Sequence, residues 1–182
     1  MKISISSLPG AGSSTVARLL AKKLGIQRID AGEIWDEIAK KYNSNVLDLN
    51  LEAEKNKSID LKIDQKMLSY AKNKKDIILE GRLCGWLCHK NHIPVFKIWL
   101  KCPLSARSLR IAQREKNDFN KILKETKQRE KSEAKRYKMY YNIDINDISI
   151  YDLVIDSLKM TPDEIVRFIV LKLKTKQFKK QI

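Results

Sequence analysis

The stretch Ser7-Leu8-Pro9-Gly10-Ala11-Gly12-Ser13-Ser14-Thr15 lies between a β-prone run at residues 3–6 and a segment with helical spacing. In that segment the apolar residues Val16, Leu19, Leu20 and Leu24 fall on one face of a helix. A strand, a glycine-rich turn and a helix in this order direct backbone N–H groups and the positive end of a helix at one point, which suits an anion. The stretch therefore predicts a phosphate-binding loop.

Two positions of this loop depart from the P-loop pattern G-x-x-x-x-G-K-[ST]. Ser7 stands in place of the first glycine, and Ser13 stands in place of the lysine. Ser14 keeps the hydroxyl that ligates a metal ion in such loops. Because backbone amides make much of the phosphate cradle, we expect residues 7–15 to bind phosphate without the lysine. The plainer alternative is that Ser14 only caps a helix.

The composition indicates one folded domain without membrane segments. The chain has 182 residues, of which 43% are hydrophobic, so a single domain over residues 1–182 can bury its own core. No apolar run approaches the ~20 residues that cross a bilayer, and the first residues lack the basic-then-apolar pattern of a secretion signal. We therefore expect a cytoplasmic protein without a membrane partner.

An excess of basic residues favours anionic ligands or partners. Lysine and arginine number 37 and aspartate and glutamate 22, which gives a net charge of +15. Nucleotides, RNA and a membrane surface all carry the matching charge. A lysine-rich composition from an AT-rich genome or a heat-adapted organism explains the excess equally well, because net charge bears on association and not on fold.

The three cysteines are expected to be reduced in a cytoplasmic chain. Two of them, Cys84 and Cys88, lie close in sequence to His89 and His92, and together these four form a set of candidate zinc ligands. The spacing matches no standard zinc pattern, and no second pair lies elsewhere in the sequence. An ordinary, partly buried segment is therefore the preferred interpretation and a metal site the alternative.

Strand-like and helix-like segments alternate along the chain, which predicts a three-layer, doubly wound α/β fold with a parallel sheet. The five expected strands are residues 2–6, 27–29, 76–80, 95–100 and 152–155. The expected helices are residues 13–24, 33–42, 60–71, 104–115 and 117–141, and a last helix that starts at the capping box Thr161-Pro162-Asp163-Glu164. Residues 43–58 are expected to form a small helical insertion, 115–141 a lid, and 174–182 a basic tail that frays.

Residues able to do chemistry follow several of these strands. Four groups come at carboxyl ends: the loop at 7–14, Asp30, Glu80-Gly81-Arg82, and Lys101-Cys102. In open α/β sheets, ligands bind beyond the carboxyl ends of the strands. We therefore expect one site that gathers these groups.

Phosphoryl transfer needs positioned phosphates, a Mg²⁺ ion and cations on the phosphate oxygens. The amides of residues 10–14 would hold the donor's phosphates, Ser14 would ligate Mg²⁺, and Glu80 would orient metal-bound water. Arg82 would grip the phosphate of the acceptor through two N–H donors. Five arginines would close over the donor as a lid that excludes water: Arg107, Arg110, Arg114, Arg129 and Arg136.

Each of these interpretations has a plainer alternative. Glu80 could be a solvated strand end, and the lid arginines could be surface charges. The charged ladder at i, i+4 steps from Lys121 to Glu133 predicts a solvated helix face. The tyrosines at 137, 140 and 141 are expected to pack in the core and not to stack on a base.

With these residues in view, the chain resembles the archaeal-type cytidylate kinases of the P-loop nucleoside monophosphate kinase family. The resemblance covers nearly the whole chain and is most specific around Glu80 and Ser149. It implies transfer of the terminal phosphate of ATP to CMP or dCMP with Mg²⁺, in the cytoplasm. It rests on LPGAG at 8–12, TVARLLA at 15–21, AGEIW at 31–35, ILEGRLCGW at 78–86, RY at 136–137, YNID at 141–144 and SIYDLVI at 149–155, with Arg107, Arg110-Ile111-Ala112 and Arg114-Glu115.

Residue by residue, the resemblance implies a complete site within one chain, so a monomer is expected. ATP is bound by residues 7–15, and the metal by Ser14 and Glu80. The insertion at 43–58 becomes the acceptor-binding region. The implied catalytic residues are Glu80, Arg110, Arg114, Arg129 and Arg136, and the implied acceptor-binding residues are Ala31, Gly32, Asp36, Gly81, Arg82, Gly85 and Trp86.

Three positions depart from the family pattern. The most consequential is Asp36, where the family usually carries an arginine that contacts the acceptor's phosphate. A carboxylate there repels that phosphate by ~1 kcal/mol or more. Since Arg82 remains and Lys40 lies one turn on, we expect weaker or altered acceptor binding and not its loss. Ser13 matches the small hydroxyl residue common in the archaeal branch, and Ser7 is tolerated if its φ is negative.

Two other functions stay open at this point. One is a degenerate nucleotide-binding protein that acts as an RNA-binding or assembly factor, which the charge of +15 and the missing lysine favour. The other is a P-loop kinase with a different small acceptor, for which Asp30 and Asp36 would be substrate contacts. The nucleotide kinase is the preferred hypothesis, and nucleic-acid binding is not favoured.

Overall fold

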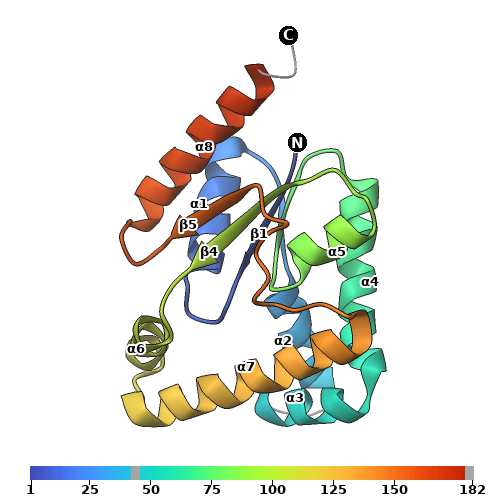
Figure 1. The fold of residues 1–182 in the computed structure, drawn as a ribbon, viewed down its shortest axis with the longest axis vertical. Coiled ribbons are helices and arrows are strands. Elements are labelled where there is room, and N and C mark those ends of the chain that lie inside the picture. The colour runs from blue at the N-terminus through green and yellow to red at the C-terminus, as the bar shows by residue number, and fades with distance from the viewer. Residues whose placement is uncertain (42–45, 179–182) are drawn as a thin grey trace.

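A five-stranded parallel sheet forms the centre of the protein, in the order β2-β3-β1-β4-β5. The computed structural model describes residues 1–41 and 46–178 (Figure 1). The sheet confirms the predicted doubly wound topology, because the chain starts in the middle and winds outward in both directions. Its strands are β1 (Lys2–Ser7), β2 (Arg28–Asp30), β3 (Ile77–Glu80), β4 (Phe96–Lys101) and β5 (Leu153–Asp156).

Helices cover both faces of this sheet and the space beyond one of its ends. On one face α1 and α8 pack in a common apolar cluster, and on the other face α4 and α5 do so. Figure 1 shows α6, α7 and α3 beyond the carboxyl ends of the strands. The helices are α1 (Ser13–Leu24), α2 (Ala31–Lys41), α3 (Val46–Lys55), α4 (Lys57–Asn73), α5 (Cys84–Lys90), α6 (Leu104–Glu115), α7 (Phe119–Tyr141) and α8 (Pro162–Phe178).

Alternation along the strands assigns each apolar side chain to one of the two faces. In β3, Ile78 joins the cluster under α1 and α8, whereas Ile77 and Leu79 join the cluster under α4 and α5. Successive side chains of a strand point to opposite faces, so a strand buried on both faces is apolar throughout. In β1 the second face is polar and still buried, because the Ser6 hydroxyl accepts a hydrogen bond from the Gly85 N–H at 3.3 Å.

Helix caps explain where the observed boundaries differ from the predicted ones. Helix α2 begins at Ala31 and not at residue 33, because the Asp30 carboxylate accepts the Gly32 N–H at 2.7 Å. Helix α4 begins at Lys57 and not at residue 60, because the Asn56 side chain accepts the Ser58 N–H at 3.1 Å. The predicted insertion at 43–58 therefore contains α3 and the start of α4, and its residues 43–45 lie outside the described part of the chain.

The predicted lid is a single long helix held on its neighbours. Helix α7 begins at the Asp118 cap, whose carboxylate accepts the Lys121 N–H at 2.8 Å. Near its other end, the Tyr140 hydroxyl donates to the carbonyls of Ala53 and Glu54 of α3 at 2.8 and 3.0 Å. These bonds fasten α7 across α3 (Figure 1).

The final helix is longer than expected. The predicted capping box is confirmed, since the Thr161 hydroxyl and amide both donate to Glu164 and the Glu164 amide donates back to Thr161. Helix α8 continues to Phe178, and residues 179–182 lie outside the description. The fraying of the basic tail stays a prediction. Among the described residues, no helix is both long and apolar enough to cross a bilayer.

Candidate active site

The phosphate-binding loop has the geometry that its sequence predicts. It leaves β1 at Ser7, turns through Gly10 and Gly12 at φ of 80° and 96°, and enters α1 at Ser13. Ser7 is not among the described residues with positive φ, so a serine fits where the pattern has glycine. Gly10 is required, because a Cβ there would lie 2.6 Å from the Arg107 carbonyl oxygen. The first amides of α1 thus face an open space beyond the sheet.

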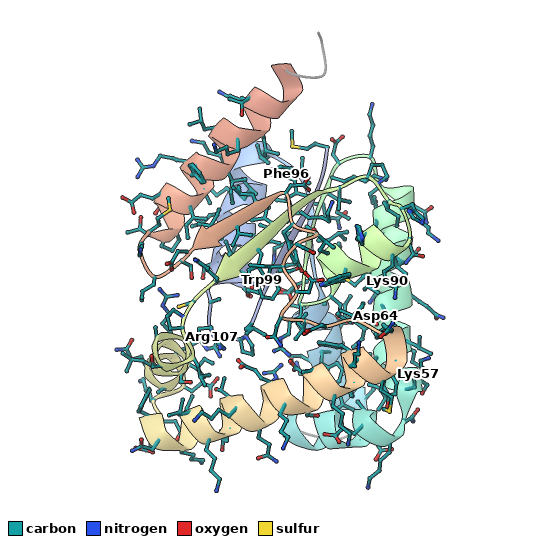
Figure 2. All side chains as sticks on the ribbon, viewed as in Figure 1. Lys57, Asp64, Lys90, Phe96, Trp99 and Arg107 are labelled. Atoms are coloured by element: carbon teal, nitrogen blue, oxygen red, sulfur yellow. The ribbon has the colours of Figure 1, made fainter. Side chains whose placement is uncertain are left out.

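Arg107 holds this loop in place through its contacts with the backbone and does not form part of a lid. This corrects its predicted role. The side chain is 3% exposed. Its guanidinium donates to the carbonyls of Pro9 at 3.0 Å and Cys102 at 2.9 Å, and it pairs with Glu130 of α7. Figure 2 shows Arg107 beside α6, next to the sheet. An arginine with five fixed donors suits a position that joins two backbone segments and a carboxylate.

The other two arginines of α6 lie in different surroundings. Arg110 donates to the Ser157 carbonyl at 2.8 Å and lies near the Ala11 carbonyl, so it borders the loop. Arg114 is 70% exposed and pairs with its neighbour Glu115. Arg107, Arg110 and Arg114 therefore have different surroundings, although their spacing predicts one helix face and one role in a lid.

Glu80 lies at the centre of the loop end of the site. Its Oε1 accepts the hydroxyls of Ser13 at 3.0 Å and Ser14 at 2.6 Å, and its Oε2 accepts Arg28 Nη1 at 2.7 Å. The carboxylate is buried, and burial is the largest influence on its pKa, which is raised; the negative charge of Asp30 adds to this, and the hydrogen bonds oppose it. Glu80 is thus a satisfied, buried carboxylate and not a solvated strand end.

Arg28 is a site residue that the sequence did not reveal. It stands on β2 and contacts three carboxylates: Asp30 at 2.6 Å, Glu80 at 2.7 Å, and Glu33. The parallel register sets Arg28 beside Ile78, two residues before Glu80, so neighbouring strands create the contact. Asp30, a substrate contact under the hypothesis of a different acceptor, caps α2, pairs with Arg28 and lines the cavity.

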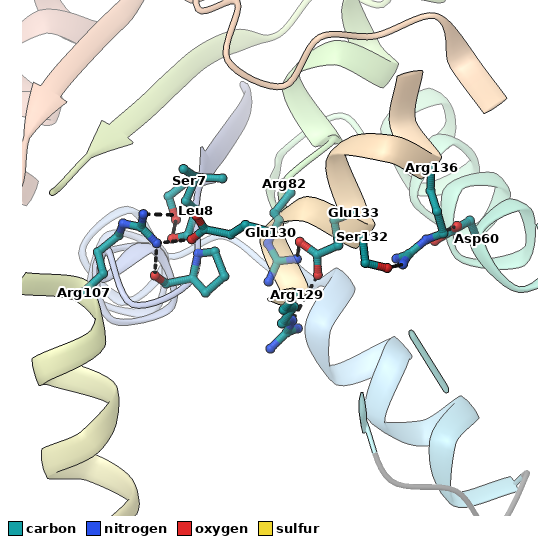
Figure 3. A network of polar contacts seen from close by, with 11 residues as sticks. Ser7, Leu8, Asp60, Arg82, Arg107, Arg129, Glu130, Ser132, Glu133 and Arg136 are labelled. Atoms are coloured by element: carbon teal, nitrogen blue, oxygen red, sulfur yellow. Dashed lines mark hydrogen bonds and ion pairs between the residues drawn. The ribbon is translucent and has the colours of Figure 1, made fainter. Parts of the chain in front are cut away.

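At the far end of the site, Glu133 of α7 lies between two arginines. Its Oε1 accepts Arg129 Nε at 3.0 Å, and its Oε2 pairs with Arg82 Nη1 (Figure 3). Glu133 is 3% exposed, so the prediction that the charged residues from Lys121 to Glu133 form a solvated helix face is wrong at Glu133. Burial, and after it the positive charge of Arg129, lower the pKa of Arg82 to about 9.

Two buried aspartates of α4 lie beyond this cluster. Asp60 accepts Arg136 Nε at 2.9 Å, and the Arg136 guanidinium lies 5.7 Å from the Trp35 ring. Asp64 accepts the Tyr141 hydroxyl, and burial raises its pKa to about 7. Figure 2 shows Asp64 above the C-terminal half of α7.

The predicted packing of the tyrosines is confirmed at residue 137. Tyr137 is buried in an apolar cluster with Trp99 and Tyr151. The hydroxyl of Tyr140 binds α3 and that of Tyr141 binds Asp64, so both side chains contact other parts of the protein.

One cavity of about 810 Å³ joins the loop end, formed by residues 7–15 and Glu80, to the far end, formed by Arg82, Arg129, Glu133, Asp60 and Asp64. Its volume lies in the range of pockets that enclose small ligands. Both ends open into the same space, so a ligand at one can meet a ligand at the other. Most predicted site residues line it: Ser7, Leu8, Pro9, Gly10, Gly12, Ser13, Ser14, Thr15, Ala31, Gly32, Asp36, Glu80, Gly81, Arg82, Arg110, Arg114, Arg129 and Arg136.

Residues 2–159 match the model of the cytidylate kinase-like family. The chain belongs to this family. A cytidylate kinase of Methanosarcina acetivorans is 47% identical over 160 residues, which cover 87% of this chain and 88% of the relative. A cytidylate kinase of Methanocaldococcus jannaschii is 44% identical over 160 residues, covering 87% and 89%. A shikimate kinase from Bacteroides thetaiotaomicron superposes with a TM-score of 0.63 at 14% identity, covering 96% of this chain and 98% of that one, so it shares the P-loop kinase fold.

Three residues assigned to the site from the family resemblance lie outside the cavity lining, although all are in the described part of the chain. Ala11 is buried, and its carbonyl accepts the Ser157 hydroxyl at 2.8 Å. Gly85 packs against the Tyr151 ring, where a Cβ would come within 2.6 Å. Trp86 contacts His89 edge to face at 5.7 Å. The structure thus places the side chains of these three residues behind the cavity lining, and their part in ligand binding stays a prediction.

Two of the candidate zinc ligands belong to the packing of α5, and one of them, Cys84, also lines the cavity. Cys84 and Cys88 are buried in the apolar cluster under α4. Burial raises the pKa of both thiols, to about 11 for Cys88, which keeps them protonated. Within the described residues, no group of three or more histidine, cysteine or acidic side chains is placed to hold a metal ion.

Proposed function

We propose that this protein transfers the terminal phosphate of ATP to CMP or dCMP, giving CDP or dCDP. The observation that carries the proposal is the cavity with a phosphate-binding loop at one end and arginines and buried aspartates at the other. Family membership supports it, because the relatives that share 44–47% of their residues over most of this chain are named cytidylate kinases.

The loop end fits a nucleoside triphosphate and a Mg²⁺ ion. The backbone amides at residues 10–14 and the start of α1 would hold the donor's phosphates. The Ser14 hydroxyl and the Glu80 carboxylate, 2.6 Å apart, present hard oxygens of the kind that Mg²⁺ prefers. When bound, the ion would neutralise charge on the phosphate oxygens. Ser14 and Glu80 would hold it, and Arg28 would keep Glu80 ionised and oriented.

The arginines would position the acceptor's phosphate and stabilise the charge of the transition state. Arg82 and Arg129 line the cavity between the loop and the aspartates, which is the place for a phosphate attached to a nucleoside. Guanidinium groups bind phosphate oxygens through paired donors. Arg110 borders the loop and would contact the transferring group. Such preorganised cations are often the largest contribution to phosphoryl transfer.

Asp60 and Asp64 offer carboxylates to an amine-bearing base. Asp64 lines the cavity with Ile63, Met67 and Leu87, so a flat ring would contact apolar walls and one carboxyl group. Carboxylates accept hydrogen bonds from the exocyclic amine of cytosine, which uracil lacks. Because burial raises the pKa of Asp64 to about 7, its neutral form is also available to donate a hydrogen bond to a ring nitrogen.

We further propose that one chain is sufficient and that the protein acts in the cytoplasm. Both ends of the cavity are built from the same chain, so no second copy is needed to complete it. ATP and nucleoside monophosphates are metabolites of that compartment.

An acceptor panel tests the proposed function. Purified protein with ATP and Mg²⁺ is offered CMP, dCMP, UMP, AMP and dTMP, and ADP release is followed by a coupled assay. CMP and dCMP are expected to turn over fastest. Turnover confined to another acceptor would support a different kinase, for which Asp36 in the cavity wall is the first residue to test. No turnover with any acceptor, together with salt-dependent RNA binding, would favour a nucleic-acid-binding role.

A further inference from the structure

Glu133 occupies the place between two cations where a bound anion would be expected. One of its oxygens pairs with Arg82 and the other accepts Arg129 Nε at 3.0 Å (Figure 3). Glu133 is 3% exposed, and all three side chains line the cavity between the loop and the aspartates of α4. Within the described part of the chain, the hydrogen bonds and ion pairs of Arg82 and Arg129 go to this one carboxylate.

The two guanidinium groups need a negative partner when the cavity holds no ligand. Burial and the neighbouring charge of Arg129 lower the pKa of Arg82 to about 9, and burial lowers that of Arg129. Arg82 and Arg129 are 16% and 34% exposed, and two partly buried like charges repel each other unless a counter-charge lies between them. Glu133 provides that charge in the structure.

Glu130, one turn earlier on α7, shows what a purely structural pair looks like. It pairs with Arg107, whose other donors are taken by the carbonyls of Pro9 and Cys102. Arg107 is therefore fixed to the protein's own backbone. Among the described residues, Glu133 is the partner that Arg82 and Arg129 share, and a phosphate presents the same paired oxygens to an arginine as a carboxylate does.

We propose that Glu133 is an internal substitute for the acceptor's phosphate. Its carboxylate holds Arg82 and Arg129 together in the empty cavity, and a phosphate that enters takes over both guanidinium groups. The inference rests on the proposed function, because it takes a phosphate-bearing acceptor as the ligand. Glu133 is then a positioning residue: it keeps the two arginines in place, and it competes with the acceptor for them.

The test is direct binding to the Glu133→Gln variant. The amide keeps the shape of the side chain and removes its charge, so the competition ends. Calorimetric titration with CMP and with inorganic phosphate is expected to give dissociation constants about tenfold lower than in wild type, which corresponds to 1.4 kcal/mol. Glu125→Gln is the matched control, because Glu125 also lies on α7 and lines the cavity. Its effect is expected to stay below about threefold, as for a screened charge.

Thermal melting separates this role from a structural one. In chloride, Glu133→Gln is expected to melt below wild type, because two partly buried arginines lose their counter-charge. Phosphate at matched ionic strength should raise the melting temperature of the variant more than that of wild type, since phosphate replaces the lost carboxylate. Glu133→Asp keeps the charge and should bind CMP like wild type.

Two results would overturn the proposal. One is a dissociation constant for CMP and phosphate that is unchanged or higher in Glu133→Gln. The other is a loss of melting temperature that phosphate does not recover more in the variant than in wild type, which would make Glu133 an ordinary structural partner. Neither measurement needs turnover, so a wild-type protein that binds CMP without phosphorylating it would refute the proposed function and leave this test intact.

Discussion

The loop end of the cavity is built largely from backbone, whereas the far end is built from charged side chains. At the loop end, two glycines with positive φ and the first turn of α1 set the geometry. At the far end, Arg82, Glu133 and Arg136 depend on partners that are distant in sequence. Backbone geometry tolerates changes of side chain, as Ser7 and Ser13 show, but a network of buried charges does not tolerate the loss of one member.

The largest expected effect comes from removing a cation at the far end. Arg129→Ala is expected to lower turnover of CMP by on the order of 10³, because a cation that stabilises the transferring phosphoryl group contributes that much. Steady-state kinetics measure it. Lys127→Ala, an exposed position on the same helix, is the control and should keep the wild-type rate. A near-normal rate for Arg129→Ala would show that the far end binds the acceptor without taking part in catalysis.

The second effect concerns the support of the loop. Arg107→Met should lower the free energy of unfolding by about 3 kcal/mol, because it leaves Glu130 and two carbonyls without their buried partner. Urea unfolding measures it, and the affinity for ATP should fall as well. Adding Glu130→Gln should recover part of the loss, because the uncompensated charge is then removed. No recovery in the double variant would place the cost in the lost carbonyl contacts.

The third effect is on the choice of base. Asp64→Asn is expected to lower the preference for CMP over UMP about tenfold, since one base-edge contact discriminates by 1–3 kcal/mol. The ratio of kcat/KM values for the two acceptors measures it. Tyr141→Phe keeps the carboxyl group while removing its hydroxyl partner, and should leave the ratio within about threefold. An unchanged ratio in Asp64→Asn would place base recognition elsewhere in the cavity.

The smallest effect is expected at the position where the loop lacks its lysine. Ser13→Lys should change turnover less than about fivefold, because Arg28 already places a cation on Glu80. In an Arg28→Gln background, the same lysine should restore part of the lost turnover, which the same coupled assay measures. A large gain from Ser13→Lys in the wild-type background would mean that Arg28 does not compensate for the missing lysine.

The features that the sequence predicted are local or periodic. The loop at 7–15 is contiguous, and Glu80 ends a strand with an apolar centre and Arg82 follows it, so both could be placed at one edge of the sheet. Helix starts were missed by two or three residues where Asp30 and Asn56 act as caps. Capping depends on which of several polar residues folds back on the chain, and composition does not decide that.

The features that the sequence did not predict are pairs between distant segments. Arg28 reaches Glu80 across 52 residues, and Arg107 reaches Pro9 across 98. Glu133 lies in a helix that is charged along its whole length, and its burial depends on where α7 crosses the site. An i, i+4 pattern indicates neighbours on a helix but not which face is covered. Only the tertiary arrangement distinguishes the buried Glu133 from the other charged residues of the same i, i+4 series.

Helix α7 has one consequence for how the enzyme moves. Besides the tyrosine hydrogen bonds to α3 and α4, its 23 residues include charged side chains that pair with other elements around the site: Glu130 with Arg107, Glu133 with Arg82, and Arg136 with Asp60 of α4. A helix of this length is a rod of ~35 Å, and a rod transmits a tilt from one end to the other. We therefore expect ligands at the two ends of the cavity to be coupled through α7. By thermodynamic reciprocity, each ligand would then alter the affinity for the other by the same factor.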